Sequence, residues 1–175
     1  MNEELQLGTI QYKWGQLDST AKITGVDLFE NYLDQGADSL VYEKGEFVYK
    51  IDKNIQYSME EVEEAIKEKL FLTSLVQEFE PLTYIGYLKV KGFDAYHIVY
   101  RQKKLRKALQ SEWQNLILKL HNDGWHPYQF NADKKGVSLY DIGIHNIGVD
   151  ENGTPRILDC AIYSRELEIQ KMARK

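Results

Sequence analysis

The sequence predicts an α+β protein, in which an antiparallel sheet with one helix precedes a shorter, mostly helical second half. Apolar residues alternate with polar ones in residues 40–51 and 84–100. Many of the twelve tyrosines alternate with aliphatic residues in strand-like runs of this kind, which favours a sheet. Residues 58–75 have the apolar spacing of a helix, and residues 111–120 and 163–175 predict two further helices.

Composition indicates a globular protein that works in the cytoplasm. The chain has 175 residues, of which 43% are hydrophobic and 28% charged, enough for one domain or two small lobes with a core. The net charge of −5 gives no general attraction to nucleic acid or to anionic membranes. Neither a long apolar run nor a signal peptide is present, so we expect no membrane association. The single cysteine, Cys160, precludes an internal disulfide and fits a reducing compartment.

Residues 40–51 predict a β-hairpin that carries a lysine among apolar neighbours. Leu40 and Tyr42 precede a Glu-Lys-Gly-Glu turn, and Phe47 and Tyr49 follow it. Lys50 stands in the second strand. A lysine on a solvent-exposed edge strand is one interpretation, and a cation that binds phosphate is the other.

Residues 58–75 predict a helix with a defined start. Ser58 and Glu61 have the spacing of a capping box, and Val62 and Leu70 belong to an apolar face. Glu68 lies beside that face, whereas Glu60, Glu61 and Glu63 suit the helix N-terminus and a solvated surface.

Three polar residues near the end of the chain predict a metal and phosphate site. Asp141 and Asn146 are five residues apart, and two short apolar strands joined by a Gly-containing turn separate Asn146 from Asp159. Closure of this hairpin brings Asn146 close to Asp159, and their oxygens are ligands of the kind that magnesium prefers. Asp141 is then placed to orient or deprotonate a hydroxyl group. The alternative is that all three residues shape turns.

The order and spacing of these three residues resemble the catalytic loop and metal-binding aspartate of the protein-kinase-like superfamily. The resemblance makes Asp141 the catalytic aspartate, and Asn146 and Asp159 the magnesium ligands. The string Val-Tyr-Lys-Ile around Lys50 resembles the third strand of that superfamily. Glu68 then occupies the place of the glutamate that pairs with this lysine, with Glu64, one turn earlier, as the alternative.

The same resemblance implies a nucleotide site with ATP and Mg²⁺ as cofactors. Gly36 and Ser39 would belong to the loop that cradles the phosphates, and Lys50 would hold the α- and β-phosphates. Tyr100 and Arg101 would supply the hinge backbone that binds adenine.

Several parts of the superfamily pattern are missing. The phosphate loop has one glycine, and Leu139 and Tyr140 replace the usual His-Arg before the catalytic aspartate. Asp159 is followed by Cys-Ala in place of Phe-Gly. The short remaining tail leaves no room for an activation loop or a peptide-docking subdomain. This compact arrangement resembles the polyvalent protein kinase domains of phages and bacterial mobile elements.

The resemblance covers about residues 33–163 and implies a kinase-like fold with three parts. Residues 1–32 form a flanking segment, residues 33–100 form an N-terminal lobe, and residues 101–175 form a truncated, mostly helical C-terminal lobe. The implied function is an ATP- and magnesium-dependent phosphotransferase whose acceptor is an unknown protein or small molecule. One alternative is a pseudokinase-like module that binds nucleotide or protein. Another is a small-molecule kinase similar to aminoglycoside phosphotransferases.

Two further clusters have simpler interpretations. The basic run at residues 101–107 is interpreted as a solvated connector in preference to a nucleic-acid site. His121, Asp123 and His126 could suggest zinc, but their spacing lacks a second ligand pair. Asp123 and the glycine after it instead favour a turn that ends a helix.

Overall fold

The computed structural model describes residues 5–175 and divides the chain into two compact units. The first unit runs up to Leu70 and resumes at Pro81–Lys104, and the second comprises Phe71–Glu80 and Leu105–Lys175. The first four residues of the predicted N-terminal segment lie outside the described residues. Among residues 5–175, no helix has the length and apolar character needed to cross a membrane.

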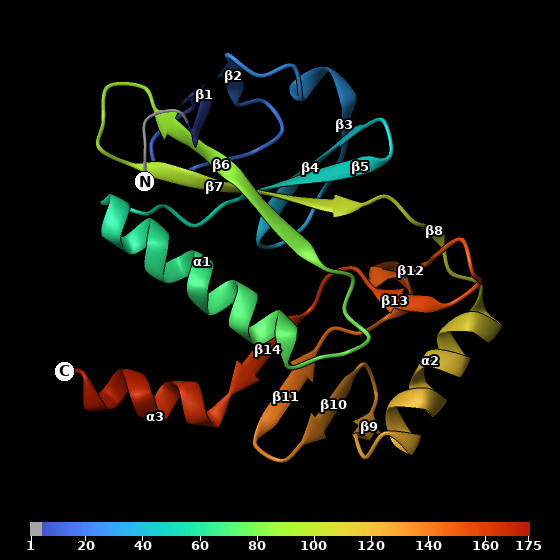
Figure 1. The fold of residues 1–175 in the computed structure, drawn as a ribbon. Helices are drawn as coiled ribbons and strands as arrows, with labels where there is room; N and C mark the ends of the chain where they lie inside the picture. The colour runs from blue at the N-terminus through green and yellow to red at the C-terminus, as the bar shows by residue number, and fades with distance from the viewer. Residues whose placement is uncertain (1–4) are drawn as a thin grey trace. The chain divides into compact units, whose positions relative to one another are not determined.

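A seven-stranded sheet dominates the first unit, in the order β2-β1-β6-β7-β5-β4-β3 (Figure 1). Neighbouring strands are antiparallel except β1 and β6, which are parallel. The unit also holds the 3₁₀ helix η2 (Phe29–Asn31) and most of helix α1 (Met59–Ser74). The strands are β1 (Gln6–Gln11), β2 (Lys22–Thr24), β3 (Tyr32–Gln35), β4 (Ser39–Lys44), β5 (Phe47–Asp52), β6 (Leu82–Val90) and β7 (Tyr96–Lys103).

The strand pairing and the helix start that local patterns predict for this unit are confirmed. Strands β4 and β5 form the expected hairpin, in which Leu40 pairs with Ile51, and the alternating residues 84–100 lie in the antiparallel pair β6 and β7. Helix α1 begins where the capping residues predict, because the Ser58 hydroxyl accepts a hydrogen bond from the Glu61 N–H at 3.1 Å. The Glu61 carboxylate accepts from the N–H of Tyr57, one residue before the position that a capping box uses.

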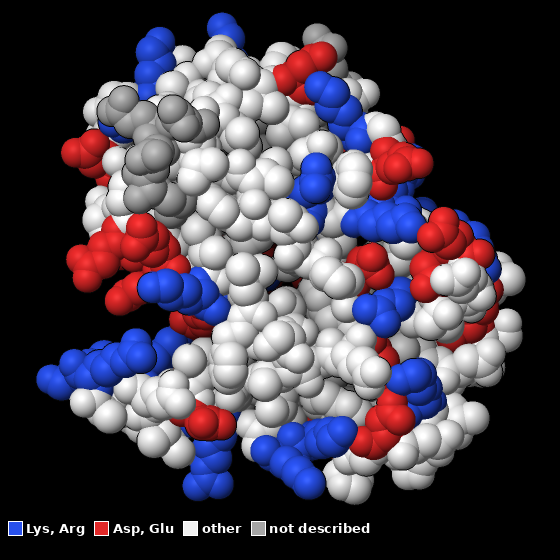
Figure 2. Space-filling view, viewed as in Figure 1, with Lys and Arg blue, Asp and Glu red and all other residues white. Residues whose placement is uncertain are grey.

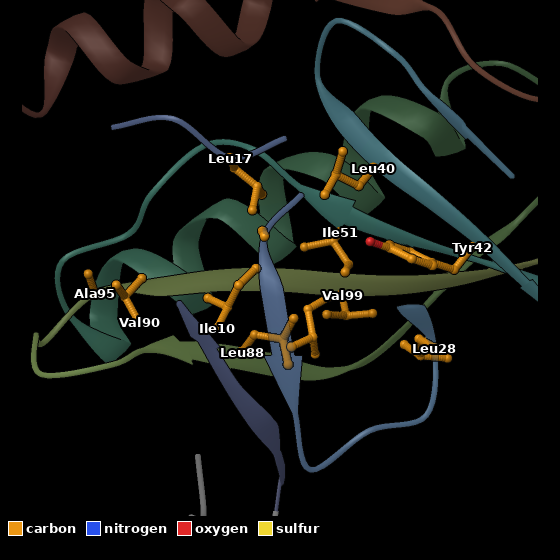
Figure 3. Close-up of a cluster of buried hydrophobic side chains, with 12 residues drawn as sticks. Ile10, Leu17, Leu28, Leu40, Tyr42, Ile51, Leu88, Val90, Ala95 and Val99 are labelled. Carbon is orange, nitrogen blue, oxygen red and sulfur yellow. The ribbon is translucent and has the colours of Figure 1, made fainter. Parts of the chain in front are cut away.

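The hydrophobic core of the first unit draws heavily on the N-terminal segment (Figure 3). Ile10 and Ile23 are almost completely buried, and Leu28 joins them against side chains from β4 to β7. Residues 5–32 are therefore part of this sheet and its core. The core cluster consists of Ile10, Leu17, Ala21, Ile23, Leu28, Leu40, Tyr42, Ile51, Leu88, Val90, Ala95 and Val99.

A fully buried histidine links three segments of this unit. The Nδ1 atom of His97 lies 2.7 Å from the carbonyl oxygen of Asp52, and the Nε2 atom lies 2.7 Å from the Tyr12 hydroxyl. Because a carbonyl only accepts, Nδ1 carries the proton and Nε2 accepts from Tyr12. Burial lowers the pKa of His97, so the neutral ring suits this position.

The second unit contains two smaller sheets and two complete helices. One sheet has the order β14-β11-β10-β9 and the other has the order β13-β12-β8 (Figure 1). The elements are β8 (Arg106–Lys107), α2 (Gln110–Asn122), β9 (His126–Tyr128), β10 (Asn131–Lys134), β11 (Val137–Tyr140), η3 (Ile144–Asn146), β12 (Ile147–Val149), β13 (Pro155–Ile157), β14 (Ala161–Ser164) and α3 (Arg165–Ala173).

The predicted fold class, a kinase-like N-terminal lobe with a mostly helical C-terminal lobe, is wrong. The structure is mostly β, with 39% strand and 26% helix, and its main feature is a large curled sheet of seven strands. The error arises mainly at residues 126–140, which form β9 to β11. Each strand there has only three or four residues, too few for an alternating pattern to stand out in the sequence. Ala132 and Leu139 are nevertheless fully buried on one side of that sheet.

Positive and negative side chains are interspersed on the face shown in Figure 2. Figure 2 shows lysine and arginine side chains beside aspartate and glutamate side chains over the face in view. In the basic run, Lys104 pairs with Glu43 at 2.7 Å, and Arg106 forms two hydrogen bonds with Glu112. Chiefly because of Arg106, the pKa of Glu112 is lowered to about 2. These pairings neutralise part of the basic run, of which residues 101–103 belong to β7 and residues 106–107 to β8.

Candidate functional site

The hairpin of β12 and β13 brings the two predicted metal ligands to one end of a sheet. Ile147 pairs with Ile157, and the Leu158 N–H donates to the carbonyl oxygen of Asn146 at 2.8 Å. This bond extends the hairpin by one residue, so that Asp159 follows directly after the partner of Asn146. Both Asn146 and Asp159 are half-buried.

The loop that ends in Asn146 folds back on itself. The side-chain Nδ2 of Asn146 donates to the carbonyl oxygen of Asp141 at 2.8 Å, and its backbone N–H donates to the carbonyl of Gly143 at 2.9 Å. Because the amide nitrogen is used within the loop, the orientation of the side chain is fixed and its Oδ1 atom is the group left to act as a ligand.

Asp141 adopts a backbone conformation that side chains other than glycine rarely take. Its φ angle is +64°, in the left-handed region, where aspartate and asparagine are the least unfavourable non-glycine residues. The Asp141 N–H donates to the Oδ1 atom of Asn131 at 3.2 Å. Such backbone strain is common in residues at functional sites, where the surrounding structure has to maintain it.

Two neighbouring segments hold the loop in this conformation. The Trp113 indole N–H donates to the carbonyl oxygen of Ile142 at 2.9 Å, and the N–H of Ile142 donates to the carbonyl of Phe130 at 2.7 Å. Sequence reasoning missed Trp113 and Asn131, because they come from α2 and β10 and no local pattern connects them with the loop.

His145 lies against the predicted catalytic carboxylate. Its Nε2 atom is 3.2 Å from Oδ1 of Asp141, and the two side chains are 66% and 61% exposed. The Asp141 carboxylate therefore has one neighbouring imidazole and remains open to solvent, as a group that accepts a proton from a substrate has to be.

Asn146 and Asp159 carry oxygen atoms of the chemical kind that magnesium binds. Magnesium binds to proteins through one or two carboxylate-type ligands and completes its shell with water and phosphate oxygens. The amide oxygen of Asn146 and the carboxylate of Asp159 would supply two hard oxygen ligands of this kind. Within the described part of the chain, no group of three or more His, Cys, Asp or Glu residues is arranged to hold a metal ion. That statement covers His121, Asp123 and His126.

The other predicted nucleotide ligands belong to the first unit. Gly36 lies in the turn between β3 and β4, where its N–H donates to the carbonyl of Ser39 at 2.9 Å and its carbonyl accepts from the Lys53 ammonium at 2.7 Å. Ser39 is the buried first residue of β4. Lys50 is half-buried on β5 and Glu68 is half-buried on α1, and their pairing stays a prediction.

The predicted hinge residues lie inside a strand. Tyr100 and Arg101 belong to β7, where they are paired with β5 on one side and with β6 on the other. Burial raises the pKa of Tyr100, and the Arg101 guanidinium lies 4.2 Å from the centre of the Phe47 ring. The chain leaves this strand only after Lys103, so the role of these two residues in adenine binding also stays a prediction.

Comparison of the chain with models of known protein families, with curated proteins and with solved structures finds no match.

Proposed function

We propose that this protein is a magnesium-dependent phosphotransferase that uses a nucleoside triphosphate and whose reacting groups are Asp141, Asn146 and Asp159. The observation that carries the proposal is the pair of 2.8 Å hydrogen bonds made by Asn146. One joins its side chain to the carbonyl of Asp141, and the other joins its carbonyl to the N–H of Leu158, next to Asp159. Asn146 thus links the predicted base, Asp141, to the other predicted metal ligand, Asp159.

The proposed roles follow from the chemistry of each group. Asn146 and Asp159 hold magnesium, which neutralises charge on the transferred phosphate when it is bound. Asp141 accepts the proton of the acceptor hydroxyl. The hydroxyl oxygen forms a bond to the γ-phosphorus, the bond from that phosphorus to the bridging oxygen breaks, and the electron pair leaves with the nucleoside diphosphate.

The backbone of Asp141 supports this role. Hydrogen bonds with Asn131 and Asn146, and the bond from Trp113 to the neighbouring Ile142, hold the backbone of the loop in place, so the position of Asp141 is set before a substrate binds. The Nε2 atom of His145 lies 3.2 Å from the Asp141 Oδ1 atom and adds a side-chain neighbour to the carboxylate.

The test is magnesium-dependent phosphate transfer or nucleotide hydrolysis by the full chain, measured with a γ-labelled triphosphate. The Asp159→Asn variant keeps the size of the side chain but removes its charge, and it should lose turnover. Asp94→Asn makes the same chemical change at an exposed turn in the first unit and should leave turnover unchanged. Equal turnover in Asp159→Asn and in the unaltered protein contradicts the proposal.

A thermal-shift measurement separates this function from a binding module without catalysis. A phosphotransferase is stabilised by magnesium and triphosphate and also transfers phosphate. A module of the pseudokinase-like kind would show stabilisation by nucleotide, or none, without any transfer.

A further inference from the structure

The turn between β12 and β13 contains the only Asn-Gly pair in the sequence, Asn152 and Gly153. In such a pair the backbone nitrogen of the second residue can attack the side-chain amide of the first. Any other residue places a Cβ atom beside that nitrogen and hinders the attack, whereas glycine has none. Both residues are exposed to water, and a Cβ atom built on Gly153 would meet no distant part of the described chain within 4 Å.

The attack converts the amide of Asn152 into a carboxylate without an enzyme. The Gly153 nitrogen gives its proton to water or hydroxide and forms a bond to the Cγ atom of Asn152. The bond from Cγ to the amide nitrogen breaks, and that nitrogen takes up a proton and leaves as ammonia. Water then opens the resulting five-membered imide ring to aspartate or to isoaspartate, in which the main chain runs through Cγ.

Asp150 holds the turn in a conformation that delays this reaction. The Gly153 N–H donates to the carbonyl oxygen of Asp150 at 3.0 Å, so the attacking nitrogen is engaged while the turn is closed. The Asp150 carboxylate accepts from the N–H groups of Asn152 and Thr154, both at 2.9 Å. Because these two bonds lie on either side of Gly153, the turn has to open before its nitrogen can attack Cγ.

Asn54 provides a control within the same chain. Its N–H donates to the Asp52 carboxylate at 3.0 Å, the same arrangement that Asn152 has with Asp150, and it is also exposed. Ile55 follows it, and the β-branched side chain of isoleucine crowds its own backbone nitrogen. We therefore expect Asn54 to keep its amide under conditions in which Asn152 loses it.

We propose that Asn152 is a site of spontaneous deamidation and that Asp150 sets its rate by holding the turn closed. The modification is independent of the proposed function, because it needs water and no nucleotide or metal. Isoaspartate lengthens the main chain by one methylene group, next to the bond of 3.0 Å from the Asp150 N–H to the Thr154 carbonyl. The product therefore loosens the hairpin of β12 and β13, whose other end carries the candidate site.

The rate is measured on the full chain, incubated at constant pH and temperature and sampled over time. Mass spectrometry of proteolytic peptides locates each amide that is lost, and fragmentation by electron transfer distinguishes aspartate from isoaspartate. We expect Asn152 to react about tenfold faster in Asp150→Ala than in the unaltered protein, a factor that one hydrogen bond to a charged acceptor can supply. Asp150→Asn keeps one acceptor oxygen and should have an intermediate rate. Asp94→Asn, at an exposed turn in the first unit, should leave the rate unchanged.

Hydrogen exchange of residues 147–157 tests the effect on the hairpin. The isoaspartyl protein is separated from the unaltered one by anion exchange, because the product has one more negative charge. Asn152→Asp carries the same charge on a normal main chain and is the matched control. We expect faster exchange in the isoaspartyl protein than in Asn152→Asp. Far-ultraviolet circular dichroism of each protein shows whether it is folded.

Four results would overturn the inference. Two concern the reaction: Asn152 keeps its amide while an unfolded peptide of residues 149–155 loses it, or Asp150→Ala reacts no faster than the unaltered protein. In the third, Asn54 loses its amide before Asn152 does. In the fourth, the isoaspartyl protein and Asn152→Asp exchange their hairpin amides at the same rate.

Discussion

The two units of this protein use their buried residues in different ways. In the first, one core of twelve side chains lies against a single large sheet, and even its buried histidine has partners at both ring nitrogens. In the second, two small sheets and a tryptophan hold a strained aspartate open to solvent. Changes in the first unit should therefore alter mainly stability, whereas changes in the loop of residues 141–146 should alter mainly activity.

The sharpest test of this comparison is Asp141→Asn, which removes the proposed base and keeps the size of the side chain. We expect phosphate transfer to fall about 10²- to 10⁴-fold, the usual contribution of a general base. The free energy of unfolding should change little, because the bonds made by the Asp141 backbone remain. The transfer rate is measured with labelled triphosphate, and the free energy of unfolding is measured by urea denaturation. Unaltered transfer would remove Asp141 from the mechanism.

Ile10→Ala tests whether changes in the core of the first unit alter stability. Ile10 is fully buried at the centre of the first core, and we expect the substitution to cost about 2–5 kcal/mol of unfolding free energy. Ile169→Ala, on the exposed side of α3, should cost less than about 0.5 kcal/mol. Urea denaturation of both variants gives the two values. Similar losses at both positions would argue against one dominant core in the first unit.

A smaller effect is expected from pH. Because burial lowers the pKa of His97, the unfolded chain takes up a proton at that residue before the folded chain does. Stability should therefore be fully present above the unfolded pKa of about 6.5 and should fall as the pH drops below it. Unfolding free energies measured across this range test the sign, and His97→Gln should flatten the profile. A profile that rises as the solution becomes more acidic would contradict the assigned neutral ring.

The smallest effect is expected from Asp141→Gly, which relieves the backbone strain of the loop. Glycine adopts a φ of +64° without a steric penalty, so the free energy of unfolding should rise by up to about 1 kcal/mol while transfer is lost. Ser138→Gly, in the neighbouring strand β11, should instead lower it by about 0.5–1 kcal/mol. Thermal unfolding of both variants measures these two opposite changes in stability. A loss of stability in Asp141→Gly would mean that the side chain contributes more than the strain costs.

The sequence predicts those parts of the fold that depend on local chemistry. The turn between β4 and β5 and the cap of α1 at Ser58 are set by residues that are close in the chain, and both are confirmed. The pairing of Ile147 with Ile157 follows equally from one short turn. The mostly helical second half is wrong because β9 to β11 are stabilised by burial of single residues such as Leu139, which leaves little trace in so short a pattern.

The candidate site, too, could be predicted from the sequence only in part. The spacing of Asp141, Asn146 and Asp159 is visible in the sequence, and the hairpin between the last two can be inferred from it. The support from Asn131 and Trp113 is not visible, because it depends on how β10 and α2 approach the loop. The positive φ of Asp141 is likewise a result of that packing.

The parallel pairing of β1 with β6 has a consequence for synthesis of the chain. Ile10 lies opposite Val90, so the first strand leaves the ribosome long before its parallel partner does. Until then β2 is the sheet neighbour that can pair with β1, and apolar side chains of these two strands, such as Ile10 and Ile23, remain in contact with water. Such late closure of distant segments slows folding. A nascent chain that ends before residue 82 should accordingly be a good substrate for chaperones that recognise exposed apolar strands.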